Sequence, residues 1–121
     1  MAAVGVDGFD LDGADGDGLE ACRLAVASFL ARCKTDGVVG RVAVVGLGDK
    51  SRLRASVAEQ VRFVFSLGAL VRSYGSGVVW VSAELARLGP SASAQVVASA
   101  DLCVRLTTFA SGSRLARLFD P

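Results

Sequence analysis

Residues 41–84, RVAVVGLGDKSRLRASVAEQVRFVFSLGALVRSYGSGVVWVSAE, decide the fold class. The first eight and last eight residues of this stretch are short β-branched runs, apolar on both faces, which is typical of strands inside a parallel sheet. The residues between them predict a long helix over about 51–74, with Asp49 or Ser51 as its N-cap and Gly75 as its end. A strand, a helix and a strand of these lengths predict a right-handed βαβ unit with parallel strands.

The predicted 51–74 helix carries two apolar stripes, so we expect more than one neighbour to cover it. One stripe consists of Leu53, Val57, Val61, Val64, Gly68 and Val71, and the other of Phe63, Leu67, Leu70 and Tyr74. A second helix is predicted before the sheet, where Asp17 and Glu20 form a D-x-x-E capping pair and Gly37 can end the helix. Its apolar face consists of Leu19, Cys22, Val26, Phe29, Leu30 and Cys33.

Amino-acid composition and the spacing of apolar residues predict the structure of the remaining segments. Residues 1–18 are rich in Gly and Asp and predict a flexible acidic linker, which leaves 19–121 as the folded domain. Residues 85–97 are small, polar and interrupted by Gly89-Pro90, so we expect a loop with a short helical turn. Residues 100–109 alternate in polarity and predict a third strand. The sequence then ends where a partner strand is expected, which indicates a part of something larger.

Composition also excludes several classes of function. The chain contains no His, which excludes Ser–His and Cys–His catalytic pairs and any zinc site with a His ligand. No apolar run reaches the roughly 18 residues that a membrane span needs, and the N-terminus lacks the early basic residues of a targeting peptide. The three Cys residues are unclustered, so we expect them to be reduced, as in a cytosolic protein.

Charge is distributed unevenly along the chain. Residues 1–20 contain six acidic and no basic residues, whereas the other 101 residues carry 13 basic against 6 acidic residues. Eleven of the basic residues are Arg, which suits bidentate contacts with phosphate or carboxylate. Arg87, Arg114 and Arg117 lie beside predicted strand ends, where they could bind nucleic-acid phosphates or form ion pairs across a subunit interface. The sequence alone favours neither role.

One motif invites a nucleotide-binding interpretation. Residues 46–51, GLGDKS, lie between a predicted strand and a predicted helix, where a phosphate-binding loop would lie. The motif is not a Walker A sequence, because Asp49 separates the glycine from Lys50 and places a negative charge where phosphate would bind. We interpret it as a tight turn. Glu84 ends the second predicted strand, where α/β folds place functional groups, but a lone Glu there is more typical of a cap or loop. Trp80 is expected in the core.

Three segments in this order resemble a known family. They are RVAVVGLGD, VRFVFSLGALVRSYGSGVVWVSAELA and SADLCVRLTTFASGSRLARLFDP, within roughly residues 38–121. Residues 62–73 are similar to a helix of the type R-F-L-x-x-L-R-A-L-L-R-S, residues 78–82 to a strand such as V-C-L-I-T-V-P, and residues 100–113 to A-D-x-V-x-x-L-x-S-F-x-G-S. On these residues the chain resembles the fourth subunit of the Elongator complex (the PAXNEB family).

The resemblance implies a partial RecA-like (P-loop NTPase-type) α/β fold with a mainly parallel sheet flanked by helices. Residues 19–121 would form the C-terminal part of that domain. The family's glycine-rich nucleotide loop has no counterpart, and GLGDK stands where the family usually has Ser-Leu-Gly-Ser-Pro. The chain would thus begin in the linker before the second half of the family's domain and stop before its end. We therefore expect an accessory subunit with no Walker A loop, no cofactor and no catalytic residues.

The resemblance also implies partners and a location. Family members join two sister RecA-like subunits in a hetero-hexameric ring that docks on the Elongator core, binds tRNA and hydrolyses ATP. A different subunit modifies the wobble uridine at carbon 5. Residues 85–97 would match the loop facing the ring centre, which makes Arg87 a candidate tRNA contact by position, with Arg114 and Arg117 as further candidates. The expected location is the cytoplasm, with the nucleus as a further compartment, and no membrane is involved.

Two other classes of protein fit the sequence. A fragment of a RecA-type, recombinase-like ATPase would bind single-stranded DNA and would assemble with ATP once an upstream nucleotide loop was restored. A small standalone α/β interaction module would be a stable, soluble monomer. The high mean hydropathy of +0.50 and the unpaired sheet edge count against the standalone module.

Overall fold

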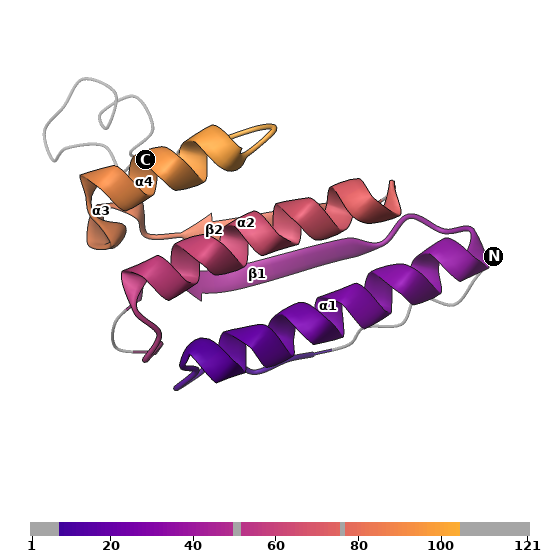
Figure 1. Cartoon of the computed structure of the whole chain (residues 1–121), viewed down its shortest axis with the longest axis horizontal. Coiled ribbons are helices and arrows are strands. Elements are labelled where there is room, and N and C mark those ends of the chain that lie inside the picture. The colour runs from indigo at the N-terminus through magenta and orange to yellow at the C-terminus, as the bar shows by residue number, and fades with distance from the viewer. Residues whose placement is uncertain (1–7, 50–51, 76, 105–121) are drawn as a thin grey trace, which may run out of the picture.

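The computed structural model describes residues 8–49, 52–75 and 77–104. Within these ranges the elements are α1 (Gly16–Asp36), β1 (Arg41–Leu47), α2 (Val57–Tyr74), β2 (Val78–Ala83), α3 (Leu85–Leu88) and α4 (Pro90–Ser99). The sheet formed by the described residues has two strands, β1 and β2, which are parallel and are connected through α2 (Figure 1). The protein is therefore mixed α/β, and the predicted strand–helix–strand order with parallel strands is confirmed.

The start of α1 differs slightly from the prediction. Asp15, rather than Asp17, is the N-cap, because its carboxylate accepts a hydrogen bond from the amide of Gly18 at 2.9 Å. Glu20 does not complete a capping box and forms an ion pair with Arg23, one turn further along the helix. The helix ends as predicted at Gly37, which adopts the left-handed conformation (φ +70°) and donates its amide to the last carbonyls.

The start of α2 was predicted too early. Neither Asp49 nor Ser51 is the N-cap; the cap is Ser56, and it forms a complete capping box with Glu59. The Ser56 hydroxyl accepts from the amide of Glu59 at 3.2 Å, and the Glu59 carboxylate accepts from the amide of Ser56 at 3.0 Å. The described residues 48–49 and 52–56 therefore belong to a connection between β1 and the helix, and Gly75 ends the helix as predicted.

The main core lies between one face of the sheet and the two long helices. Figure 1 shows α1 and α2 side by side over this face. Most of the predicted apolar face of α1 is buried there, with Phe29 partly buried, together with Val44 and Leu47 of β1 and Phe63 and Leu67 of α2. The other stripe of α2 contributes Val61 to a smaller cluster with Leu88 and Ala92. Val64 and Val71 of the same stripe pack against the main core, so the two stripes are not separated, but more than one neighbour covers α2, as predicted.

The opposite face of the sheet is exposed, which differs from the prediction of strands buried on both faces. Side chains alternate along each strand, and the pairing register places the exposed positions of β1 beside those of β2. The exposed pairs are Arg41 with Val78, Ala43 with Trp80 and Val45 with Ser82. Trp80, expected in the core, is 58% exposed. We call these six residues the open sheet face.

Three segment assignments also differ from the structure. The predicted loop at 85–97 is mostly helical, because Pro90 occupies the first turn of α4 and does not interrupt it. Of the predicted third strand at 100–109, the described part, 100–104, has no strand pairing, and the rest lies outside the described residues. The described part of the 1–18 segment is a helix start preceded by backbone that hydrogen-bonds to residues 52–55. No helix in the described ranges is long and apolar enough to cross a membrane.

Candidate functional site

The carboxyl ends of β1 and β2 bring together the polar residues that the sequence singled out. Ligands of parallel α/β folds bind at this edge of the sheet. Here Gly48 follows β1 with φ +84°, and a Cβ on Gly48 would lie 2.7 Å from the backbone oxygen of Glu84. The amide of Glu84 in turn donates to the carbonyl of Leu47 at 2.9 Å. The two strand ends are therefore in direct backbone contact, and position 48 requires glycine.

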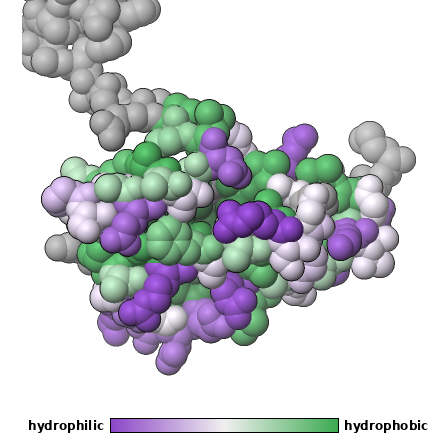
Figure 2. Space-filling model, turned by 45° about the horizontal axis from the view of Figure 1, so that its top comes forward, coloured by the Kyte–Doolittle hydropathy of each residue, from purple (hydrophilic) through white to green (hydrophobic). Residues whose placement is uncertain are grey.

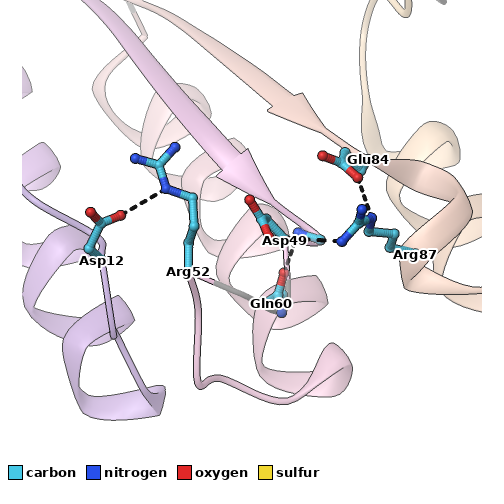
Figure 3. Close-up of polar contacts among 7 residues, drawn as sticks. Asp12, Asp49, Arg52, Gln60, Glu84 and Arg87 are labelled. Carbon is cyan, nitrogen blue, oxygen red and sulfur yellow. Dashed lines mark hydrogen bonds and ion pairs between the residues drawn. The ribbon is translucent and has the colours of Figure 1, made fainter.

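Gln60 fixes the connection between β1 and α2. Its side-chain oxygen accepts from the amide of Gly48 at 2.8 Å (Figure 3), and its Nε2 donates to the carbonyl of Ala55 at 3.1 Å. Among the residues that the structure describes, Gln60 is the polar residue with a buried side chain. Both the oxygen and the nitrogen of its side-chain amide form hydrogen bonds, so neither is buried without a partner. The sequence analysis did not single out this residue. One signal was available: Gln60 lies three residues before Phe63 and seven before Leu67, on the face of the second apolar stripe.

Arg87 lies between two carboxylates. Its Nε is 2.5 Å from Oε2 of Glu84, and its Nη1 is 4.0 Å from Oδ1 of Asp49 (Figure 3). Arg87 comes from α3, Glu84 from the residue before α3, and Asp49 from the loop after β1. All three side chains therefore meet at the carboxyl edge, and the guanidinium is about half exposed. The arrangement is an ion-paired cluster with an exposed cation, and neither carboxylate faces the other as an acid–base pair.

The phosphate-loop interpretation of GLGDKS gains no support from this geometry. The amide of Gly48 donates to Gln60, so it is not available to an anion. The helix α2 begins at Val57, eight residues after Asp49, so the motif does not itself supply the first amides of a helix. Lys50 and Ser51 lie outside the described residues. Among the residues that the structure describes, no group of three Cys, Asp or Glu residues could hold a metal ion.

The acidic segment before α1 is attached to the loop that precedes α2. The amide of Gly13 donates to the carbonyl of Arg52, and Ala14 accepts from the amides of Arg54 and Ala55 at 2.8 and 2.9 Å. The Nε of Arg52 also lies 3.0 Å from Oδ1 of Asp12 (Figure 3). These contacts position the N-terminus of α1 near that of α2.

Two shallow grooves lie on the helix-covered side. One lies between the N-terminal halves of α1 and α2 and has mixed charge, with Glu20, Arg23, Glu59 and Arg62 among its lining residues. The Arg23 guanidinium, hydrogen-bonded to Glu20, lowers the pKa of that carboxyl, so these two charges largely neutralise each other. The other groove lies between α2 and α4 and is mainly apolar. Figure 2 shows hydrophobic and hydrophilic residues intermixed at the surface seen from this side.

The structure describes one of the three arginines that were predicted as candidate tRNA contacts. Arg87 lies at the carboxyl edge with an exposed guanidinium, whereas Arg114 and Arg117 lie outside the described residues. The open sheet face is the larger unexpected feature, because Val45, Val78 and Trp80 form an exposed apolar surface on a parallel sheet. Parallel sheets are normally covered on both faces, so this surface has the character of an interface.

The chain was also compared with known proteins. No family model, no curated protein and no solved structure matches it.

Proposed function

We propose that the chain is a non-catalytic accessory subunit of the Elongator type. In this proposal it assembles with two sister RecA-like subunits into a hetero-hexameric ring on the Elongator core. The ring binds tRNA in the cytoplasm, with the nucleus as a further compartment, while another subunit modifies the wobble uridine at carbon 5. The family resemblance of residues 38–121 is the reason for naming this assembly, and a partial RecA-like fold is part of the proposal.

The observation that carries the proposal is the open sheet face. A small parallel sheet with helices on one face leaves Val45, Val78 and Trp80 exposed on the other. Exposed apolar surface of this kind on a parallel sheet favours a chain that completes its fold against a partner. The carboxylates Glu84 and Asp49 are both engaged with Arg87, which agrees with a non-catalytic role.

Co-expression with the two sister RecA-like subunits, followed by native mass determination, tests the assembly. A stoichiometric complex of ring-like mass is expected. Val78→Asp places a charge on the open sheet face and should abolish the complex. Val38→Asp is the matched control, because Val38 is exposed to the same degree (38% against 40%) but precedes the sheet. A folded monomer that binds neither subunit would overturn the proposal in favour of a standalone module.

Arg87 is the tRNA contact to test among the described residues. Arg87→Ala in the assembled ring should weaken tRNA binding and lower the slope of log affinity against log salt by roughly 1, as the loss of one phosphate contact does. Arg52→Ala is the control, because Arg52 is similarly exposed and also ion-paired, but lies in the loop before α2. Arg114→Ala and Arg117→Ala test the other two candidates. Equal effects of the Arg87 and Arg52 variants would exclude a specific role for Arg87.

A further inference from the structure

The open sheet face has a defined chemical layout. Trp80 pairs with Ala43 in its middle, Val78 pairs with Arg41 at the amino end of the sheet, and Val45 pairs with Ser82 at the carboxyl end. The face is therefore apolar in its centre, cationic at its amino end and uncharged at its carboxyl end.

The exposed area is too small for a stable homodimer. Trp80, Val45 and Val78 together expose on the order of 250 Å² of apolar surface, taking usual side-chain areas and their exposed fractions. A stable protein–protein interface buries about 800 Å² on each partner. A single helix laid along the two strands needs only an apolar stripe of a few hundred Å², and helices are the elements that cover parallel sheets.

The charge at the amino end orients such a helix. Arg41 forms no ion pair with any of the residues that the structure describes. The C-terminal end of a helix carries partial negative charge, and acidic side chains in its last turn add to this charge. A helix that runs antiparallel to β1 and β2 would place this end beside Arg41. The crossover helix α2 runs in the same antiparallel sense on the other face (Figure 1).

We propose that the open sheet face binds an amphipathic helix of a partner chain, antiparallel to the strands, with an acidic C-terminal turn against Arg41. The inference deepens the proposed function, since it names the element that the partner supplies, and it rests on that function only for the existence of a partner. Trp80 would lie at the centre of the contact. Because it is the single Trp of the chain, its fluorescence reports directly on this face.

The test is a fluorescence titration of the full chain with a synthetic helix. The probe is an 18-residue peptide without Trp or Tyr, with leucines on one helical stripe and two glutamates in its last turn. A peptide of the same composition with scattered leucines is the control. The stripe peptide should shift the Trp80 emission to the blue in a saturable way. Val45→Asp should weaken binding about ten-fold or more, because it buries a charge under the helix.

Two further variants establish location and orientation. Val39→Asp should leave binding within about two-fold of the unaltered chain, because Val39 is as exposed as Val45 (61% against 65%) but lies before β1. Arg41→Glu should reverse the preference, so that a peptide with two lysines in its last turn binds better than the glutamate peptide. Equal binding of both peptides by both forms would overturn the proposed orientation.

Other occupants give different results. No saturable shift up to millimolar peptide overturns the proposal. A blue shift that depends on the concentration of the chain itself, without peptide, indicates a second copy. An emission that is already blue and moves to the red when residues 105–121 are removed indicates that this segment covers the face. If the sister subunits form the ring but the peptide does not bind, only this inference fails. If the peptide binds but the ring does not form, only the proposed function fails.

Discussion

The side-chain oxygen of Gln60 accepts a hydrogen bond from the amide of Gly48 at 2.8 Å, which joins the first turn of α2 to the end of β1. The same side chain donates to the carbonyl of Ala55, at the other end of the connecting loop. A single buried amide thus holds both ends of the loop, and the conformation of the loop depends on it.

Replacing this amide should destabilise the fold strongly. Gln60→Leu leaves a buried donor at Gly48 and a buried acceptor at Ala55 without their partner, so we expect a loss of about 2–4 kcal/mol in the free energy of unfolding. Urea denaturation followed by circular dichroism measures the loss. Gln95→Leu is the control, because the Gln95 side chain makes an exposed contact with Ser91. Similar losses for both variants would show that the buried bonds contribute little.

Gly48 should not tolerate a side chain. Gly48→Ala places a Cβ 2.7 Å from the Glu84 backbone oxygen and forces a non-glycine residue to φ +84°. We expect a loss of at least about 2 kcal/mol, because both the contact and the dihedral angle are unfavourable. Gly8→Ala, at a position where a Cβ meets nothing within 4 Å, should change the melting temperature little. A Gly48→Ala protein with the same melting temperature as the unaltered chain would contradict the close approach of the two strand ends.

Stability should depend on pH through Glu59. Hydrogen bonds from the amide and hydroxyl of Ser56 lower the pKa of Glu59 from its ordinary value of 4.5. Arg62 lowers it further, and desolvation and Asp15 oppose the shift. A lowered folded-state pKa stabilises the fold above pH 4.5, and this stabilisation is lost as the pH falls through the lowered pKa. Glu59→Gln keeps a capping residue but cannot titrate. Between about pH 7 and pH 3 it should therefore lose less stability than the unaltered chain. Parallel pH profiles of the two proteins would argue against this role.

The three cysteines should differ in reactivity. Cys22 and Cys33 are buried and free, whereas Cys103 is free and exposed. Burial raises the pKa of the Cys22 thiol, which reduces its thiolate fraction as well as its access to reagents. Titration with an aromatic disulfide reagent should show one fast thiol, removed by Cys103→Ser, and two that react only in denaturant. Two or more fast thiols in the native protein would indicate that α1 does not pack on the sheet.

Hydrophobic periodicity predicted most of the elements. The apolar face of α1 and the apolar positions of α2 follow from residue spacing, because burial repeats with the helical period. The two strands follow from their short β-branched runs. The early start given to α2 arose because Asp49 and Ser51 are also capping residue types. The S-x-x-E pattern of Ser56 and Glu59 was the better signal. The helix α4 was missed because Pro90 was interpreted as a breaker rather than as a first-turn residue.

The candidate site was harder to predict from the sequence than the helices and strands. The sequence analysis singled out Glu84, Asp49 and Arg87 one by one. Their ion pairs depend on the parallel alignment of two strand ends that are far apart in the chain. The bond between Gln60 and Gly48 depends on the same alignment. The exposure of Trp80 could not be predicted, because a strand that is apolar on both faces has the same sequence pattern whether one face or both are covered.

The alternation along β1 has a consequence for how the protein responds to substitution. Val44 is buried under the helices, whereas its neighbour Val45 points out from the opposite side of the sheet. Substitutions at Val44 should change the free energy of unfolding. Substitutions at Val45 should change it little, and should instead change the affinity for whatever binds the open sheet face. Two adjacent positions of one strand therefore govern two separate properties, and folding and association can be tuned independently within a single dipeptide.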